Sequence, residues 1–304
     1  MLDLIILGAG PAGITAGIYA ARKRMKFLLL TKDVGGQATW SGDVENYIGF
    51  QFISGFDLVE KFREHLEHFK ADLHEEEPAV RIERAGQHMK VVTGKGAYQA
   101  RTVIIATGRT PWLLGAKGEE EFRHRGVTYC ATCDGPLFSD MDVAVIGGGN
   151  AGFDAVLQLM NIARNIMVVE IQPQVIADPI MVEKARASGK VVIHTSTAVE
   201  EIYGSKLVEG IRVRKDGELL DIPVRGVFVE IGSLPASDIM PELERNKLRE
   251  VTVDCKCRTN VPGVFAAGDV TDVPAKQIIV ACGEGCKALL TAFEYISTKS
   301  EKDW

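Results

Sequence analysis

The sequence has little of three features that would define its class. Only six of its 304 residues are cysteines, which is far too few for a disulfide-rich scaffold. Its lysines and arginines are scattered and its net charge is −6, so the basic stripe of a nucleic-acid-binding protein is missing. No segment has the length and apolarity of a membrane span, and the apolar first residues contain Asp3 and no basic leader, unlike a secretion signal. These absences favour a cytoplasmic protein without nucleic-acid or membrane partners.

Length and composition favour an ordinary globular enzyme of two domains. A chain of 304 residues exceeds what one hydrophobic core usually supports. Its hydrophobic fraction of 46% and charged fraction of 25% are typical of folded globular proteins. In a chain without an export signal, most thiols are expected to be reduced.

Two segments carry the glycine fingerprint of a dinucleotide-binding unit. In the first, an apolar run at residues 3–7 leads into GAGPAG, a helix-compatible stretch and a second apolar run at residues 27–30. The second segment reads MDVAVIGGGNAGFDAVLQLM and is followed by the strand-like NIMVVE. Each has the strand before and the helix after that GxGxxG requires, so we expect two nucleotide sites. The fingerprint positions are Gly8, Gly10 and Gly13 in the first copy and Gly147, Gly149 and Gly152 in the second.

The order of the segments predicts an α/β fold with two Rossmann-like dinucleotide-binding domains, the second inserted in the first. A strand at residues 102–106 closes the first pattern, which breaks at Gly108 and Pro111. The later segment RTNVPGVFAAGDV returns to an apolar strand that ends in Gly268 and Asp269. We therefore expect one domain at residues 1–113 and 246–304 and an inserted domain at residues 114–245.

The segment CATCDG, which begins at Cys130, suits metal binding, a structural disulfide or electron transfer. Zinc needs four ligands, and neither a second CxxC nor an HxxxH partner at finger spacing lies nearby. His65 and His68 are better explained as a solvated helix face, so no metal site is expected. A redox dithiol needs two sulfurs close enough to close a small ring, and a CxxC at a helix start lowers one thiol pKa.

Together these motifs resemble the low-molecular-weight thioredoxin reductases of the flavoprotein disulfide reductase superfamily. The resemblance covers nearly the whole chain through GAGPAG, GGQAT with VENYIGF, ATG, CATCDG, GGGNAG, RTNVPGVFAAGDV and KQIIVACGEG. It implies FAD in the first domain, a nicotinamide nucleotide in the second, and a homodimer. The CxxC within the second domain separates this group from the larger glutathione-reductase-like enzymes.

The resemblance also assigns binding residues by position. It implies that the FAD pyrophosphate lies against the first glycine turn, and that Asp269 holds a ribose or ribityl hydroxyl. The backbone at the start of the last helix would lie near the flavin pyrimidine oxygen. The implied FAD residues are Gly8, Gly10, Pro11, Ala12, Gly13, Thr31, Gly36, Gln37, Asn46, Thr107, Gly108, Gly268, Asp269, Gln277 and Ile278. The implied nicotinamide-nucleotide residues are Gly147, Gly149, Asn150, Ala151, Gly152 and Glu170.

The family pattern gives the two thiols different roles. It implies that Cys133 exchanges electrons with the flavin and that Cys130 attacks the disulfide of thioredoxin or a similar small redox protein. Asp134 is then expected to carry a proton for the leaving thiol, with a helix N-cap as its alternative role.

The second fingerprint departs from the NADPH-using members of the family. Those members place an arginine cluster after the second strand of the nucleotide domain, whereas this chain has no Lys or Arg between Arg164 and Lys184. Glu170 ends that strand, where a carboxylate accepts hydrogen bonds from a ribose 2′-hydroxyl and repels a 2′-phosphate. Its alternative role is a solvated strand end. NADH is the expected donor, while ferredoxin, a deazaflavin, or NADPH held in an unusual way stay open.

Two rival functions and four further cysteines complete these expectations. The flavoprotein of an alkyl hydroperoxide reductase carries an additional N-terminal thioredoxin-like region, whereas this sequence begins its first strand at Asp3, so that function is not favoured. A non-catalytic flavin redox sensor would use the same dithiol to signal without turnover.

The other cysteines, expected to be small semi-buried side chains outside the mechanism, are Cys255, Cys257, Cys282 and Cys286.

Overall fold

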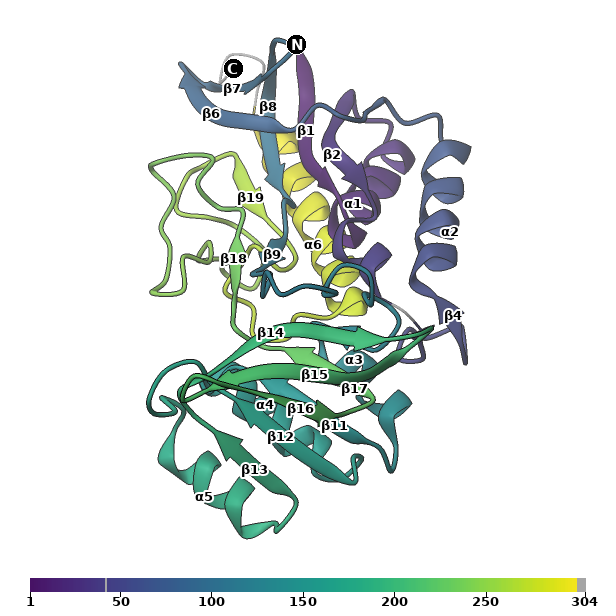
Figure 1. Ribbon diagram of the computed structural model, residues 1–304. Helices are drawn as coiled ribbons and strands as arrows, with labels where there is room; N and C mark the ends of the chain where they lie inside the picture. The colour runs from purple at the N-terminus through teal and green to yellow at the C-terminus, as the bar shows by residue number, and fades with distance from the viewer. Residues whose placement is uncertain (42, 300–304) are drawn as a thin grey trace. The chain divides into compact units, whose positions relative to one another are not determined.

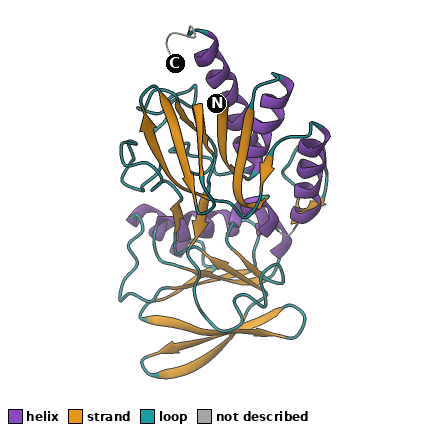
Figure 2. Cartoon of the chain, turned by 90° about the horizontal axis from the view of Figure 1, so that it is seen from above, coloured by secondary structure: helices purple, strands orange, loops and turns teal. Residues whose placement is uncertain are grey.

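The computed structural model describes residues 1–41 and 43–299 of the chain. By its internal contacts the chain forms two compact units (Figures 1 and 2). Each unit has its own sheet with a parallel core, so the expected α/β class with two Rossmann-like units is confirmed. Unit 1 comprises Met1–Thr39, Tyr47–Thr110 and Leu234–Trp304, and unit 2 comprises Trp40–Asn46 and Pro111–Ser233.

Unit 1 is built on a seven-stranded sheet in the order β5-β2-β1-β8-β7-β6, with β19 paired to β8. The sheet forms around β1, whose apolar side chains are buried and which pairs in parallel with both β2 and β8. β6 and β7 extend the sheet as an antiparallel hairpin. The strands are β1 (Leu2–Ala9), β2 (Phe27–Val34), β5 (Leu73–His74), β6 (Ala79–Ala85), β7 (His88–Thr93), β8 (Ala97–Ile105) and β19 (Val264–Ala266).

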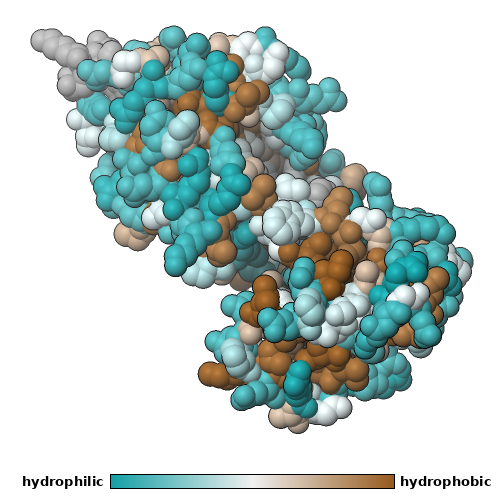
Figure 3. Space-filling model, turned by 60° about the vertical axis from the view of Figure 1, so that its left-hand side comes forward, coloured by the Kyte–Doolittle hydropathy of each residue, from teal (hydrophilic) through white to brown (hydrophobic). Residues whose placement is uncertain are grey.

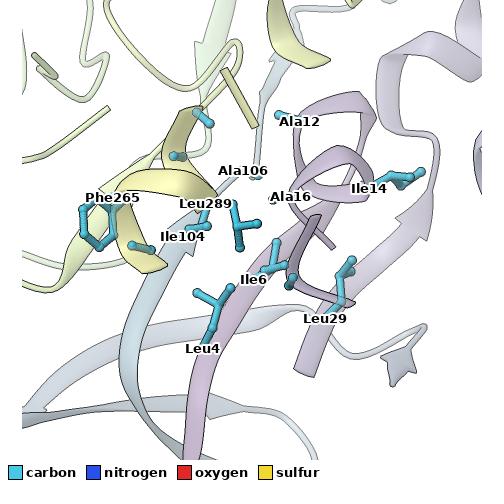
Figure 4. Packing of buried hydrophobic residues seen from close by; sticks show 14 of the residues in the cluster. Leu4, Ile6, Ala12, Ile14, Ala16, Leu29, Ile104, Ala106, Phe265 and Leu289 are labelled. Atoms are coloured by element: carbon cyan, nitrogen blue, oxygen red, sulfur yellow. The ribbon is translucent and has the colours of Figure 1, made fainter. Parts of the chain in front are cut away.

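Two helices of unit 1 pack closely side by side. Helix α1 (Pro11–Arg22) begins directly after β1 and lies against α6 (Ile278–Ser297). Glycine permits this approach, because a Cβ on Gly285 would lie 2.0 Å from the carbonyl oxygen of Ala12. Figure 4 shows buried aliphatic side chains between these helices and the central strands. The packing fixes the start of each helix at the carboxyl end of the sheet.

Unit 2 contains a five-stranded, parallel sheet in the order β10-β17-β11-β12-β13. Its strands are rich in valine and isoleucine, as expected where both faces of a sheet are buried. Helices α4 and α5 cover one face, and the antiparallel sheet β14-β15-β16 covers the other. The elements are β10 (Val127–Thr128), α3 (Ala131–Asp134), β11 (Asp142–Ile146), α4 (Asn150–Leu159), β12 (Asn165–Val169), α5 (Pro179–Ala187), β13 (Val191–His194), β14 (Thr197–Gly204), β15 (Val208–Lys215), β16 (Glu218–Pro223) and β17 (Gly226–Val229).

The boundaries between the units differ from the sequence expectation. Trp40–Asn46 and residues 111–113, expected in the other domain, belong to unit 2. Residues 234–245, expected in the inserted domain, belong to unit 1. Three apolar side chains explain this: Ile239, Met240 and Leu243 are buried in the core beside the unit 1 sheet. The Ile82 N–H also donates to the Ile239 carbonyl at 2.8 Å. The segment lacks a regular hydrophobic period, so its sequence did not reveal this packing.

The remaining elements are short, apart from one helix. Helix α2 (Gly55–His68) carries His65 and His68 at exposed positions, so the predicted solvated face is confirmed.

In the described ranges, no helix is long and apolar enough to cross a membrane. The surface in Figure 3 is largely hydrophilic, with hydrophobic residues in separate patches. The short elements are η1 (Gly36–Trp40), β3 (Asp43–Val44), β4 (Ile53–Ser54), β9 (Arg109–Pro111), η2 (Gly135–Phe138) and β18 (Ser233–Pro235).

Candidate functional site

The first glycine turn, between β1 and α1, leaves space where a nucleotide phosphate is expected. Gly8 has a φ of 101°, and a Cβ there would lie 2.3 Å from the carbonyl oxygen of Ala106. A Cβ on Gly13 would lie 1.8 Å from the carbonyl oxygen of Gly8. In contrast, a Cβ on Gly10 would approach only the Gly35 carbonyl oxygen, at 4.0 Å. The fold therefore requires the outer glycines, whereas the middle glycine keeps a space that a pyrophosphate fits.

The start of α1 supplies groups that suit an anion in this space. Gly10 is the N-cap, and no side chain caps the helix. Pro11 occupies the first helical position, and no acidic residue lies in the first turn. The N–H groups of Ala12 and Gly13 therefore lie at the positive end of the helix dipole. These residues fit the phosphates of a dinucleotide.

Other expected FAD residues follow the ends of neighbouring strands of unit 1. Strands β1, β2, β8 and β19 are parallel, so their carboxyl ends share one edge of the sheet. A Cβ on Gly36, after β2, would lie 3.6 Å from Cα of Gly10, so these two turns are adjacent. Gln277 is the N-cap of α6, and Ile278 begins that helix. The expected residues after β8 and β19 are Thr107, Gly108, Gly268 and Asp269.

Thr31 holds the first turn in place. It is 4% exposed, and its hydroxyl accepts a hydrogen bond from the Ala9 N–H at 3.1 Å. The same hydroxyl donates to the Asp33 carbonyl at 2.5 Å. Both contacts are internal, so the structure gives Thr31 a supporting position behind the turn.

Gln37 and Thr107 are also engaged within unit 1. The Gln37 side-chain amide donates to the Arg109 carbonyl at 2.6 Å, and the Thr107 hydroxyl donates to the Ala236 carbonyl at 2.7 Å. Asn46 differs, because its segment Trp40–Asn46 is grouped with unit 2. Its expected place along the flavin therefore stays a prediction.

A charged cluster around Glu250 was not predicted from the sequence. Glu250 is 5% exposed, and its carboxylate lies 3.1 Å from both the Arg109 guanidinium and the Lys276 ammonium. Burial raises the pKa of the Asp269 carboxyl, while the charges of Lys276 and Arg109 act in the opposite direction. The cluster thus supplies cations near the carboxyl expected to bind a cofactor hydroxyl. Its members come from separate segments, so no local motif could reveal it.

The second glycine turn, between β11 and α4, repeats the geometry of the first. Gly147 has a φ of 121°, and a Cβ there would lie 2.5 Å from the carbonyl oxygen of Glu230. A Cβ on Gly152 would lie 2.0 Å from the carbonyl oxygen of Gly147. A Cβ on Gly149 would approach only Cγ1 of Ile176, at 4.0 Å. The space at the middle glycine again fits a dinucleotide.

Two hydrogen-bonded side chains border the second turn. The Asn150 side-chain oxygen accepts from the Asp178 N–H at 2.9 Å, which holds the loop after β12 near the start of α4. One Glu170 carboxylate oxygen accepts from the Gly148 N–H at 2.5 Å, and the other accepts from the Gln172 N–H at 2.7 Å. Glu170 is thus ordered against the turn, and its oxygens retain lone pairs for a further donor. Ala151, in the first turn of α4, is exposed.

The expected dithiol lies at the end of β10 in unit 2. Cys130 is the N-cap of α3, and its Sγ accepts from the Cys133 N–H at 3.2 Å. The two cysteines form a disulfide with their Cα atoms 5.3 Å apart. The short helix therefore brings both sulfurs together, as redox cycling requires.

Asp134 lies within the same loop. Its carboxylate accepts a hydrogen bond from the Thr128 hydroxyl, and its N–H donates to the Cys130 carbonyl at 3.1 Å. The side chain is 9% exposed. Asp134 occupies the N-cap position of η2, but its side chain makes no capping hydrogen bond to that helix. Its role as proton carrier stays a prediction.

Glu230 was missed by the sequence reasoning. It follows β17, and its carboxylate accepts from the Ala131 N–H at 3.4 Å, beside the dithiol. Burial raises its pKa to about 7, and the charge of Asp154 adds to this shift. The hydrogen bond from Ala131 opposes the shift. A glutamate after an apolar strand was visible in VFVE, but only the strand order places it next to the cysteines.

The four other cysteines have separate surroundings. Burial raises the pKa of Cys257 to about 12 and also raises that of Cys282, whose Sγ lies 3.8 Å from the Tyr47 hydroxyl. Cys286 is half-buried, but Cys255 is exposed, so the expected burial is wrong there. Cys255 follows Asp254 in a surface turn. Within residues 1–41 and 43–299, no cluster of three or more His, Cys, Asp or Glu could hold a metal ion.

Comparisons with known proteins agree with this geometry. The family model of the pyridine nucleotide-disulphide oxidoreductases matches residues 2–285. The chain belongs to this family. A thioredoxin reductase from Streptococcus pyogenes MGAS5005 has a TM-score of 0.94 and 36% identity, covering 98% of this chain and 99% of that one. A thioredoxin reductase from Giardia duodenalis has a TM-score of 0.92 and 32% identity, with the same coverage.

The curated relatives are longer than this chain. A subunit of the alkyl hydroperoxide reductase from Escherichia coli (strain K12) is 41% identical over 97% of this chain and 58% of its own length. An NADH dehydrogenase from Ferdinandcohnia aciditolerans is 38% identical over 97% of this chain and 57% of its own length. The chain thus spans less than two thirds of these relatives.

These comparisons place the chain in a family. It is a member of the pyridine nucleotide-disulphide oxidoreductases, and the expected resemblance to thioredoxin reductases is confirmed. The family uses FAD and a nicotinamide dinucleotide. The open middle glycine of each turn fits this use of two dinucleotides.

Proposed function

We propose that the chain is an FAD-dependent thioredoxin-disulfide reductase. It takes two electrons from a reduced donor and delivers them through Cys130 and Cys133 to the disulfide of a thioredoxin-like protein. The observation that carries this proposal is the dithiol on α3, at the same sheet edge of unit 2 as the second glycine turn. A small-loop disulfide of this kind stabilises a fold little, because it closes only a short loop.

The two glycine turns take separate nucleotides. The turn at Gly8–Gly13 holds FAD, and the turn at Gly147–Gly152 holds the nicotinamide dinucleotide, with Glu170 accepting from its ribose hydroxyls. FAD, when bound, supplies the two-electron chemistry that links the donor to the dithiol.

The dithiol reduces its partner in two exchanges. The Cys130 thiolate attacks a sulfur of the partner disulfide, which forms a mixed disulfide and releases one partner thiolate. Cys133 then attacks Sγ of Cys130, which reforms the Cys130–Cys133 disulfide and releases the second partner thiolate. Each released thiolate takes up one proton, and Asp134, within the loop, supplies one of them. Two electrons and two protons regenerate the dithiol.

Replacing each cysteine tests this function. We expect Cys130→Ser and Cys133→Ser to lower turnover with oxidised thioredoxin by about a thousandfold or more, because neither variant can complete the exchange. Cys255→Ser is the matched control, since this cysteine is exposed and lies in unit 1, and it should keep wild-type turnover. Wild-type turnover in both dithiol variants would show that the CxxC is structural. Absence of turnover in the wild type with every partner would favour a redox sensor.

NADH is the proposed donor. Glu170 faces the second turn, and a 2′-phosphate would meet its negative charge without a cation from residues 165–183. Ferredoxin or a deazaflavin is the alternative donor.

The curated relatives support a second partner. Several are subunits of alkyl hydroperoxide reductases, at up to 41% identity. The same dithiol chemistry would then serve the disulfide carrier of a hydroperoxide-reducing system. Turnover with thioredoxin and with such a carrier, measured side by side, distinguishes the two. The proposed homodimer is tested by sedimentation.

A further inference from the structure

Glu230 is a titratable side chain that the proposed function leaves unused. Parallel strands end at a common edge, and in unit 2 their order is β10-β17-β11-β12. The edge therefore carries first the dithiol, then Glu230, then the glycine turn and last Glu170. Glu230 lies between the two parts of the site.

Unit 1 has no carboxyl group at the corresponding place. Ala106 directly follows β8, and Glu230 directly follows β17. The Ala106 N–H donates to the Leu7 carbonyl of β1, and the Glu230 N–H donates to the Ile146 carbonyl of β11, both at 2.8 Å. Each also presents its carbonyl oxygen to the first glycine of a turn. The glycine turn therefore forms equally well beside an alanine. The carboxyl of Glu230 is therefore not needed to form the turn, which leaves it available to the neighbouring dithiol.

The carboxylate reaches the dithiol through the backbone between the cysteines. One Glu230 oxygen accepts from the Ala131 N–H at 3.4 Å, while the Cys133 N–H points to Sγ of Cys130 at 3.2 Å. The Glu230 carboxylate and Sγ of Cys130 thus both accept from backbone N–H groups of the segment Cys130–Cys133. A thiolate formed there would have a second anion bound to the same short segment, and nearby like charges disfavour each other.

We propose that Glu230 is a positioning residue that tunes the dithiol: it holds the Ala131 N–H and, when ionised, disfavours the neighbouring thiolate. This inference rests on the proposed redox function of Cys130 and Cys133. Glu230 is only partly buried, so it can exchange protons with solvent.

The charge of Glu230 changes near neutral pH. Burial raises its pKa to about 7, and the exposed Asp154 on α4 adds to the shift. The other acidic groups at this edge are Asp134, whose carboxylate is held by Thr128, and Glu170, which is held at the Gly148 turn. Below its pKa the neutral Glu230 leaves the thiolate undisturbed, and above its pKa the ionised Glu230 opposes it. The thiolate titration of the reduced protein should therefore be broadened across neutral pH.

Titration of the reduced protein tests this proposal without a donor or a partner. The ultraviolet absorbance of the thiolate is followed against pH in wild type, Glu230→Gln and the matched control Glu183→Gln, an exposed carboxylate on α5. Glutamine keeps an oxygen that can accept from Ala131 but removes the charge. We expect Glu230→Gln to lower the pKa of the more acidic thiol by about one unit and to sharpen the titration. The control should titrate as the wild type does.

A second variant keeps Glu230 but changes the pH at which its carboxyl group ionises. Asp154→Asn removes the neighbouring negative charge, so Glu230 should ionise at lower pH and the broadening should shift downward. A Glu230→Gln titration identical to that of the wild type would overturn the proposal, as would an unmoved transition in Asp154→Asn. If Glu230→Gln does not fold, the Asp154→Asn result decides. Because the measurement needs no turnover, a failed proposed function and a failed role for Glu230 give separate results.

Discussion

The two glycine turns share one backbone plan and differ in one side chain. In each, the N–H between the first two glycines donates to a side chain 22 residues further on. In unit 1 this is the buried hydroxyl of Thr31, which the Ala9 N–H meets at 3.1 Å. In unit 2 it is the carboxylate of Glu170, which the Gly148 N–H meets at 2.5 Å. The same backbone geometry is therefore bordered by a neutral side chain in unit 1 and by a negatively charged side chain in unit 2.

The comparison distinguishes the role of the glycines in each turn from the role of the side chain that follows the second strand. The outer glycines are required by backbone contacts in both turns, and the middle glycines leave equal space. We expect the fingerprint to set where a dinucleotide lies. We expect the side chain after the second strand to set which ribose is accepted, since a carboxylate binds hydroxyls and repels a 2′-phosphate.

The largest effect should come from the third glycine of each turn. Gly13→Ala and Gly152→Ala place a Cβ within 1.8 Å and 2.0 Å of a backbone carbonyl oxygen. We expect each to destabilise its own unit by about 3 kcal/mol or more, because backbone cannot yield as a side chain can. Urea unfolding, monitored for each unit, measures the loss. Wild-type stability in either variant would show that the two turns do not depend equally on their third glycine.

The middle glycines should affect binding instead of folding. Gly10→Ala and Gly149→Ala add a methyl group to open space, so both proteins should keep wild-type unfolding midpoints. We expect Gly10→Ala to weaken FAD binding, and Gly149→Ala to weaken binding of the nicotinamide nucleotide, each by about a hundredfold. Flavin content and nucleotide titration measure the two losses. An exchange of these two phenotypes would reverse the assignment of the cofactors.

The smallest effect should come from the carboxylate. Glu170→Ala with Gln172→Arg and Gln174→Arg removes the repulsion and supplies cations for a 2′-phosphate. We expect the ratio of NADPH to NADH reduction rates to rise by about tenfold or more. Thr31→Val is the matched control in unit 1, since it removes the equivalent acceptor and should leave this ratio unchanged. Stopped-flow reduction rates with each nucleotide provide the ratio, and an unchanged ratio in the triple variant contradicts the role of Glu170.

Much of the site could be predicted because its parts are local in the sequence. A glycine turn lies between its own strand and helix, and a CxxC closes within four residues, so each motif carries its own geometry. The exceptions depend on distant segments. Glu230 gains its neighbours from the strand order, and Glu250 meets Arg109 and Lys276 from far along the chain. Residues 234–245 lack a periodic pattern, which is why their unit was misassigned.

Anaerobic reduction of the purified protein shows which donor reduces the flavin and whether the electrons reach Cys130 and Cys133. Wild type and Cys133→Ser are mixed with NADH, NADPH, reduced ferredoxin or reduced deazaflavin, and flavin bleaching and new thiols are followed together. We expect NADH to bleach the flavin faster than NADPH and to expose two new thiols per wild-type chain, but none in Cys133→Ser. Comparable bleaching by both nucleotides, or reduction by ferredoxin or deazaflavin alone, would contradict NADH as donor. Bleaching without new thiols in the wild type would contradict the electron path through Cys130 and Cys133.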